Sequence, residues 1–261
     1  MRIAIIGAGN MGSWLVESLC LDYEVGVYDV DRSKLKYFFN SRKFLYYEEI
    51  MDFKPDILIN AASLDRTIEL FDEIVSYLPE NCIVADITSV KSGLSEYYKK
   101  LGKRFVSTHP MFGPTFANLK DLSNQHAVII TESDEEGKVF FRDFYKKLKI
   151  NIHDYSFKEH DETIAYSLSI PFASTMVFAA CMKEQEAPGT TFKRHYRIAE
   201  GLLSEDDFLL SEILLSPDSL GQIERISEQM ESLKAMIRSR DKDQLKVFFA
   251  MLRNNIGLKS Q

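Results

Sequence analysis

Residues 2–12 read RIAIIGAGNMG, a short apolar run followed by a glycine-rich turn. The run is rich in β-branched side chains, which favour a strand. After the turn, Trp14, Leu15 and Leu19 recur at helical spacing. A GxGxxG motif holds the pyrophosphate of a dinucleotide when it joins a strand to a helix in this way. The segment therefore predicts a dinucleotide-binding domain.

The residues of this turn have different expected tasks. Gly7 permits the tight turn, Gly9 lets the backbone approach a pyrophosphate, and Gly12 allows the helix to pack closely on the strand. Asn10 and Met11 begin the helix, whose N-terminus offers free N–H groups and a partial positive charge. We expect these five residues to bind the cofactor. The alternative is a glycine turn that only punctuates the structure.

Asp29 follows the second apolar run, residues 24–28. A carboxylate at this position accepts hydrogen bonds from an adenosine ribose diol and repels a 2′-phosphate, so NAD is favoured over NADP. Arg32 could receive a 2′-phosphate, which keeps NADP as the alternative. Asp29 or Asp31 could instead cap a helix that starts near residues 32–34.

Further short apolar runs follow, separated mostly by helical patterns such as those over 64–78 and 91–101. These runs occupy residues 56–60, 82–87, 104–107, 126–131 and 150–155. Strands that alternate with helices pair in parallel and carry helices on both faces of the sheet. Residues 1–156 are therefore predicted to form an α/β domain with a Rossmann-type, doubly wound parallel sheet.

Residues 157–261 show helical periodicity without convincing strands, which predicts a second, all-helical domain for binding substrate. Its apolar faces, for example Phe172, Met176 and Val177, exceed what one thin layer of helices would bury. We therefore expect a homodimer formed through this half of the chain.

The composition excludes several classes of protein. The 261 residues are 45% hydrophobic and carry a net charge of −7, so the surface should repel nucleic acid and anionic lipid. Three cysteines, odd in number and without metal-ligand spacing, predict reduced thiols and no metal site. No apolar run of about 20 residues and no signal peptide is recognised, which predicts a cytoplasmic protein without a membrane segment.

Two segments follow predicted strands at the edge where open α/β folds bind ligands. They are residues 86–91, DITSVK, and residues 107–114, STHPMFGP. The imidazole of His109 could accept a proton from a substrate hydroxyl, as an alcohol oxidation requires, or could be satisfied by backbone groups alone. The turn at Gly113 and Pro114 could close over a ligand.

These segments, together with the glycine turn and EHDETIAY at residues 159–166, resemble the prephenate dehydrogenase family. The resemblance extends over about residues 2–220, and HPMFGP with the EHD segment is its most selective part. It implies that prephenate is oxidised at its ring C4 hydroxyl with hydride transfer to NAD+. Loss of the ring carboxylate then gives 4-hydroxyphenylpyruvate and CO2.

The resemblance also implies roles for individual residues. It makes His109 the hydrogen-bond acceptor for the hydroxyl and Ser89 its partner, and it places Lys91 near the cofactor and substrate. From the residues alone, Ser89 could orient the imidazole or cap a helix from Lys91 onward. His160 and Asp161 resemble a family pair, and either a structural role or a substrate contact would explain them.

The chain departs from the family pattern in its second half. Many members carry Ser-His-Leu-Pro-His where residues 168–172 read LSIPF, so both histidines are absent and Ser169 could replace one of their hydrogen bonds. The family also places a substrate-binding arginine five residues before an aspartate. Gly201, five residues before Asp206, stands at that position.

A dianionic substrate still requires positive charge, and the same predicted helix carries it. Lys193 and Arg197 share a helical face with Gly201, and Arg194 lies close to that face. We expect Arg197 to bind the side-chain carboxylate in a bidentate manner, with Lys193 or Arg194 assisting. The alternative is a solvated basic face.

Other functions fit the same fold. Arogenate dehydrogenase differs only in a substrate amine that replaces the keto group, and reductases of imines or β-hydroxyacids also join a GxGxxG turn to helices. A non-catalytic dinucleotide sensor belongs to another class of protein and would bind NAD without turnover.

Overall fold

The computed structural model describes residues 1–112, 121–205, 207–216 and 219–258. It divides into two compact units: Met1–Ile164 with Leu203–Ser216, and Ala165–Leu202 with Pro217–Gln261. This division differs from the predicted boundary after residue 156. The first turns of the helix that begins at residue 157 belong to the first unit, and a later helix returns to it.

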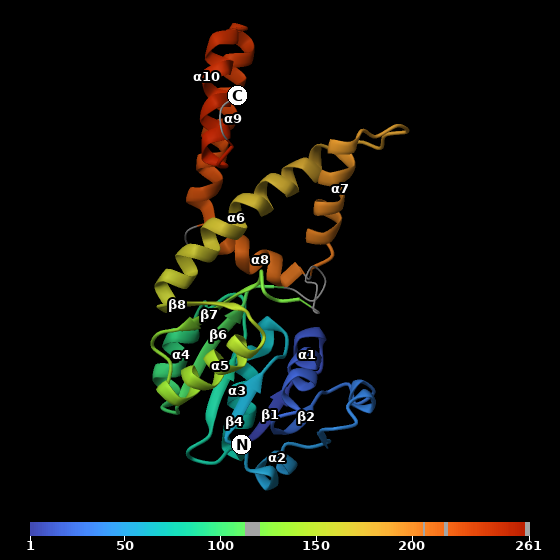
Figure 1. The fold of residues 1–261 in the computed structure, drawn as a ribbon, viewed down its shortest axis with the longest axis vertical. Coiled ribbons are helices and arrows are strands. Elements are labelled where there is room, and N and C mark those ends of the chain that lie inside the picture. The colour runs from blue at the N-terminus through green and yellow to red at the C-terminus, as the bar shows by residue number, and fades with distance from the viewer. Residues whose placement is uncertain (113–120, 206, 217–218, 259–261) are drawn as a thin grey trace. The chain divides into compact units, whose positions relative to one another are not determined.

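The first unit contains an eight-stranded sheet in the order β3-β2-β1-β4-β5-β6-β7-β8 (Figure 1). The strands are β1 Arg2–Ile6, β2 Glu24–Tyr28, β3 Arg42–Phe44, β4 Ile57–Asn60, β5 Ile83–Asp86, β6 Phe105–Pro110, β7 His126–Ile130 and β8 Asn151–Tyr155. Strands β1 to β6 pair in parallel. The strand order reverses between β1 and β4, which makes this the switch point where doubly wound sheets bind ligands. The predicted fold class is confirmed.

Two details of the sheet differ from the expectation. β7 pairs antiparallel with β6, and β8 then pairs parallel with β7. Antiparallel neighbours require no crossover helix, and the described part of the connection between β6 and β7 contains none. β3 was not predicted because only Phe44 of its three residues is buried, too short a pattern to read.

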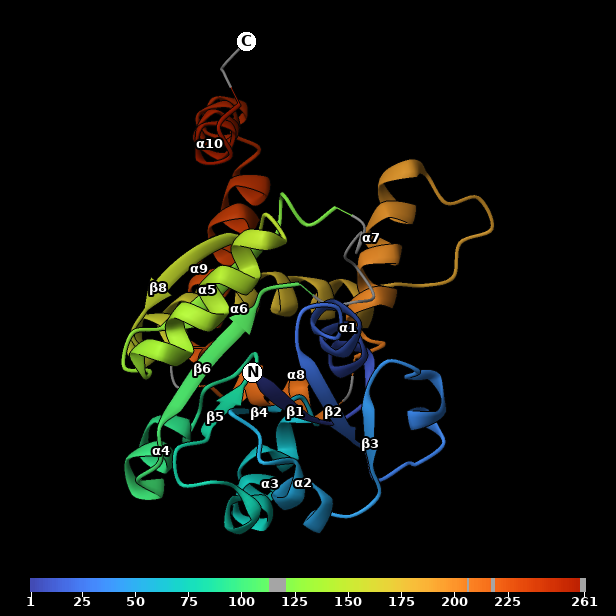
Figure 2. The ribbon, with the colours of Figure 1, turned by 60° about the horizontal axis from the view of Figure 1, so that its bottom comes forward.

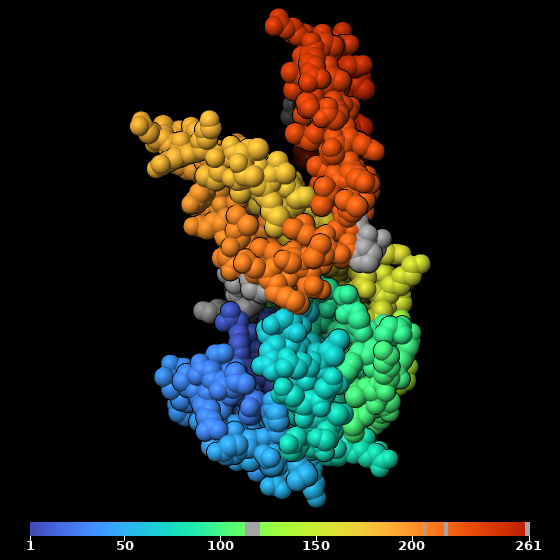
Figure 3. All heavy atoms as spheres, turned by 180° about the vertical axis from the view of Figure 1, so that it is seen from behind, coloured from blue at the N-terminus to red at the C-terminus, as the bar shows by residue number. Residues whose placement is uncertain are grey.

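Helices cover both faces of this sheet (Figure 2). α1 and α5 pack on one face, where Leu15 and Phe141 enter the core, and α2, α3 and α4 pack on the other, where Phe71 and Tyr98 do so. Their bounds are α1 Asn10–Leu19, α2 Glu48–Phe53, α3 Thr67–Ile74, α4 Leu94–Leu101 and α5 Glu135–Lys147, with short 3-10 turns η1 Lys34–Tyr37, η2 Leu64–Arg66 and η3 Val75–Tyr77. Figure 3 shows α3 (cyan) beside α4 (green) on the second face.

The aligned register of the central strands brings their carboxyl ends to one edge. Ile6 pairs with Asn60, Asn60 with Asp86, and Asp86 with Ser107. The glycine turn after β1, the DITSVK segment after β5 and the end of β6 therefore lie along the same edge of the sheet.

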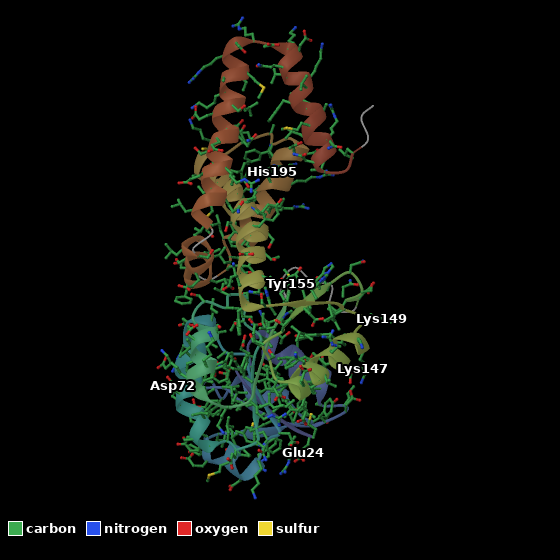
Figure 4. All side chains as sticks on the ribbon, turned by 90° about the vertical axis from the view of Figure 1, so that its left-hand side faces the viewer. Glu24, Asp72, Lys147, Lys149, Tyr155 and His195 are labelled. Carbon is green, nitrogen blue, oxygen red and sulfur yellow. The ribbon has the colours of Figure 1, made fainter. Side chains whose placement is uncertain are left out.

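The described residues of the second unit form helices and the loops that connect them, without a strand. It contains most of α6 Phe157–Cys181, α7 Thr190–Leu202, α9 Ser219–Ser239 and α10 Lys242–Asn255. The rings of Phe192 and His195 on α7 each lie 5.5 Å from Phe178 on α6 (Figure 4 labels His195). α8, Asp207–Leu215, belongs to the first unit and contacts η2.

α6 has the length and composition of a membrane-spanning helix, with 25 residues and an apolar window that is only 22% buried. This corrects the expectation that no apolar segment reaches that length. The serines at positions 167 and 169 and Pro171 concealed the run in the sequence, although all three lie inside the helix. Helices with this composition also occur in the cores and interfaces of proteins outside membranes.

Candidate functional site

The glycine turn has the local geometry that its sequence predicts. Gly7 has a φ of +95°, and a Cβ atom there would lie 2.6 Å from the Ala61 carbonyl oxygen. A Cβ on Gly12 would lie 1.9 Å from the Gly7 oxygen, so α1 approaches the turn too closely for any side chain. A Cβ on Gly9 would meet nothing within 4 Å. Two of the glycines are thus required by packing, and the third leaves open space beside the backbone.

Asp29 closes the other side of this turn. Its buried carboxylate accepts a hydrogen bond from the Ala8 amide at 2.6 Å and one from the Asp31 amide at 2.8 Å. The Lys34 ammonium lies 3.4 Å from it. Asp31 instead accepts from the Ser33 amide at 3.0 Å, just before η1. The N-cap residue of η1 is Ser33, so neither aspartate is the cap of that turn, and Asp29 is fixed to the glycine turn.

The first residues of α1 fit the pyrophosphate of a dinucleotide. Gly9 is the N-cap residue and provides no side chain to occupy the free N–H groups, Asn10 is exposed and Met11 is half-buried. Arg32, the candidate for a 2′-phosphate, donates to the Leu45 carbonyl at 3.3 Å.

A fully buried ion pair lies at the ends of β5 and β6. The Lys91 ammonium, 0% exposed, lies 2.5 Å from Asp86 Oδ1, 2.7 Å from the Thr108 carbonyl oxygen and 3.3 Å from Thr88 Oγ1. These three acceptors match the three protons of an ammonium group. Lys91 therefore joins β5 to β6 from inside, and its expected place near the cofactor and substrate stays a prediction.

The carboxylate of this pair stays ionised although it is buried. Burial acts to raise the pKa of Asp86, but the Lys91 charge and hydrogen bonds, including one from the Tyr98 hydroxyl at 2.7 Å, lower it overall. Burial also lowers the pKa of Lys91, and Asp86 opposes that effect. The pair is stable only as a unit, because either charge alone would be costly in this environment.

Ser89 lies at a bend between Asp86 and Lys91 in the sequence, and it is half-buried. α4 begins at Leu94, and its N-cap residue is Gly93. Ser89 therefore does not cap a helix, and the structural alternative for this serine is removed.

His109 is the penultimate residue of β6 and is 7% exposed. Its Nδ1 atom lies 3.0 Å from Nε2 of His160, which is 1% exposed in the first turn of α6. The Nδ1 atom of His160 lies 3.1 Å from Oδ1 of Asp161. The EHD segment was recognised in the sequence, but no spacing signal connects it to a strand end about fifty residues earlier. This partner of His109 was therefore missed.

The surroundings of His109 keep its imidazole neutral. Burial lowers the pKa of His109 well below 6.5, and positive charge on His160 or Lys91 would lower it further. Burial also lowers the pKa of His160, although Asp161 opposes that effect. A neutral imidazole can accept a proton, which is the state that a general base requires.

The segment after His109 packs on the nucleotide-binding helix. The ring of Phe112 meets the Trp14 ring edge-on, with centroids 5.3 Å apart, and Trp14 lies on α1. This contact ties the HPMF segment to the helix that follows the glycine turn. The predicted closing turn at Gly113 and Pro114 lies outside the described residues.

The predicted substrate-binding residues lie in the second unit. Lys193, Arg194 and Arg197 are exposed on α7. Ser169 is 0% exposed, and its hydroxyl lies 2.6 Å from that of Ser219 at the start of α9. Ser169 thus joins two helices inside this unit, and the substrate contact expected for it stays a prediction.

Comparisons with known proteins agree with the motifs. The family model for the nucleotide-binding domain of prephenate dehydrogenase matches residues 26–151. A probable arogenate/prephenate dehydrogenase of Methanocaldococcus jannaschii is 23% identical over 208 residues, 73% of this chain and 45% of that protein. The chain spans about half the length of the curated relatives it matches.

Two solved structures share the fold over nearly the whole chain. Prephenate dehydrogenase from A. aeolicus, in complex with hydroxyphenyl propionate and NAD+, is 20% identical with a TM-score of 0.83, covering 98% of this chain and 97% of that one. Synechocystis arogenate dehydrogenase is 17% identical with a TM-score of 0.78, covering 98% of each chain. The resemblance inferred from the motifs is confirmed.

The buried ion pair makes a prediction about stability. We expect Lys91→Met to lower the free energy of unfolding by about 3–5 kcal/mol, because it leaves the Asp86 carboxylate buried without its partner. Lys99→Met is the matched control, since Lys99 pairs with Glu96 on the surface and should change stability by at most about 1 kcal/mol. Urea unfolding monitored by circular dichroism measures both. Equal effects of the two substitutions would contradict the role given to Lys91.

Proposed function

We propose that the chain, which belongs to the prephenate dehydrogenase family, catalyses the NAD-dependent oxidative decarboxylation of prephenate to 4-hydroxyphenylpyruvate and CO2 in tyrosine biosynthesis. The observation that carries the proposal is a buried, neutral imidazole at the same sheet edge as the nucleotide-binding turn. An alcohol oxidation requires this combination of a hydride acceptor and a proton acceptor.

In the proposed reaction, His109 accepts the proton of the ring C4 hydroxyl, and Ser89 donates or accepts a hydrogen bond at the same oxygen. NAD+, when bound at the glycine turn, supplies the acceptor for the hydride that leaves C4. The bond to the ring carboxylate then breaks, CO2 departs, and the electron pair makes the ring aromatic. Protonated His109 can return its proton to the phenol oxygen, so that no net proton is released.

The position of Asp29 supports NAD rather than NADP as the cofactor. Its carboxylate is fixed beside the Ala8 amide at the glycine turn, where it would face an adenosine ribose. A 2′-phosphate would meet this negative charge. Lys34 and Arg32 are the nearby cations that an NADP-dependent enzyme would use, but Lys34 contacts Asp29 and Arg32 contacts Leu45.

Arogenate is the second candidate substrate. The M. jannaschii relative is named for both substrates, and the Synechocystis structure is an arogenate dehydrogenase. The two substrates differ only where prephenate has a keto group and arogenate an amine, and the second unit lacks both histidines and the arginine of the family pattern. The preference for prephenate or arogenate would therefore depend on contacts between α7 and the side chain of the substrate.

The proposed function is tested by measuring NADH or NADPH absorbance with prephenate and arogenate, each offered NAD+ and NADP+. We expect turnover with prephenate and NAD+. We expect His109→Asn to lower kcat by about 10²–10⁴-fold while NAD+ binding persists, because the proton acceptor is lost. His126→Asn, at the start of β7, is the control and should retain kcat. NAD+ binding without turnover of either substrate would favour the non-catalytic sensor instead.

We also propose that Arg197 binds the side-chain carboxylate of the substrate, with Lys193 or Arg194 assisting. All three are exposed on α7, and Gly201, one turn after Arg197, lies on the same helical face.

For this proposal we expect Arg197→Ala to raise the KM for prephenate by about 10–10²-fold, since a hydrogen bond to a charged group contributes about 1.5–3 kcal/mol. Arg238→Ala in the last turn of α9 is the control and should leave the KM unchanged. An unchanged KM for Arg197→Ala with a raised KM for Arg194→Ala or Lys193→Ala would move the role to those residues.

We further propose a cytoplasmic homodimer formed through the second unit. Apolar side chains remain exposed on all four of its helices, including Val177, Ile198, Met230, Ile237 and Phe249. We expect a second copy of the chain, rather than lipid, to cover the apolar side of α6. The reason is that the first turn of this helix carries the EHD segment and packs in the first unit.

Sedimentation without detergent tests the dimer. We expect a species of twice the 30.1 kDa chain mass and its conversion to a monomer by Val177→Asp, which places a charge on the exposed apolar side of α6. Recovery of the protein only with membranes, or as a monomer before substitution, would contradict this proposal.

A further inference from the structure

Three side chains form a continuous hydrogen-bonded chain that ends at His109. Asp161 Oδ1 lies 3.1 Å from His160 Nδ1, and His160 Nε2 lies 3.0 Å from His109 Nδ1. His160 is almost fully buried, whereas the Asp161 side chain is 45% exposed. All three residues belong to the first unit. The chain therefore runs from a partly hydrated carboxylate to the buried imidazole of the proposed site.

We propose that Asp161 and His160 are positioning residues that fix the tautomer of His109, so that its Nε2 atom is the proton acceptor. The inference rests on the proposed function of His109 as a general base. The EHD segment would then act on the reaction by setting the tautomer of His109. This task differs from both a purely structural role and a direct contact with the substrate.

The order of donors along the chain follows from the carboxylate. An ionised aspartate only accepts hydrogen bonds, so His160 must carry its proton on Nδ1. A neutral imidazole has one proton, which leaves Nε2 of His160 as an acceptor. His109 must then carry its own proton on Nδ1 to donate to His160. Nε2 of His109 is left with a lone pair for the substrate hydroxyl.

The opposite order would disable the proposed base. If His160 carried its proton on Nε2, it would donate to Nδ1 of His109 and lose its bond to Asp161. His109 would then carry its proton on Nε2 and could only donate to the hydroxyl. The Asp161 carboxylate disfavours this arrangement because it would lose its hydrogen bond to His160.

The same chain would stabilise His109 after it accepts the proton. The imidazolium would donate through Nδ1 to a neutral His160, whose dipole is oriented by Asp161. The charged groups that act on the two histidines are Asp161, Asp86 and Lys91. Because Lys91 is neutralised by Asp86, the carboxylate of Asp161 supplies the remaining negative charge.

A second histidine pair in the same unit provides a matched control. His126 Nδ1 lies 2.9 Å from His153 Nε2, nearly the same contact between the same ring atoms. His126 lies at the start of β7 and His153 in the middle of β8. Their contact is exposed to solvent, whereas the contact between His109 and His160 is buried.

The tautomer can be measured without turnover. In protein labelled with 15N in histidine, we expect the side-chain NMR signals of His109 at neutral pH to show a protonated Nδ1 and an unprotonated Nε2. In His160→Phe, which keeps the ring shape but removes the acceptor, the signals should shift toward the other tautomer. Protonation of His109 on Nε2 in the unmodified protein would overturn the proposal.

Kinetics give the second measurement. We expect His160→Phe to lower kcat by at least about 10-fold and by no more than the about 10⁴-fold that a histidine in the wrong tautomer loses. The KM values should change little. His160→Gln should restore most of kcat because its amide oxygen can accept from His109 Nδ1, and His153→Phe should leave kcat unchanged. A wild-type kcat for a folded His160→Phe variant, or equal losses for the Phe and Gln variants, would overturn the proposal.

Different results would refute the proposed function and the task proposed for His160. Absence of turnover with both substrates in the unmodified protein would refute the proposed function, and the NMR measurement would still report the tautomer. Turnover that persists unchanged in His160→Phe would refute only the task given to His160.

Discussion

The buried ion pair between Lys91 and Asp86 is the interaction on which the geometry of the site depends. It joins the end of β5 to the backbone of β6 through the Thr108 carbonyl, one residue before His109. A buried charge pair stabilises the contact between two strands only if both partners are present and fully hydrogen-bonded, because either charge alone would be costly to bury. The pair also fixes the position of the end of β6, because the three acceptors around the Lys91 ammonium group must lie in set directions from it.

Two further contacts converge on the same edge of the sheet. Asp29 binds the amide of Ala8 and so connects β2 to the glycine turn, and Phe112 packs on Trp14 of the helix behind that turn. The nucleotide-binding turn and the strand that carries His109 are thus connected by side chains as well as by the sheet. A hydride acceptor and a proton acceptor must be held in register for an alcohol oxidation, and rigid elements do this better than loops.

Much of this arrangement could be predicted from local patterns. Strand, turn and helix at residues 2–19 carry their own signals, and parallel strands bring their carboxyl ends together without further information. The task of Lys91 could not be predicted, because a lysine after a strand looks the same whether it faces a ligand or a buried carboxylate. The bond between Ser169 and Ser219 could not be predicted either, because the two residues are 50 positions apart in the sequence. His160 required knowledge of which helix turn meets which strand, which depends on tertiary packing. The substrate side is the least predictable part, because Gly201 stands where the family pattern has an arginine and the proposed function must choose among several exposed cations on α7.

α6 contains both a partner of His109 and a core contact of the second unit. His160 lies in its first turn, and Ser169, nine residues later, is bonded to the start of α9. Each residue of an α-helix advances the direction of its side chain by about 100°. A single insertion or deletion between these positions would therefore change the direction of Ser169 relative to His160 along the helix by about 100°. Natural variants of this protein should tolerate changes of residue type along this stretch far more readily than changes of its length.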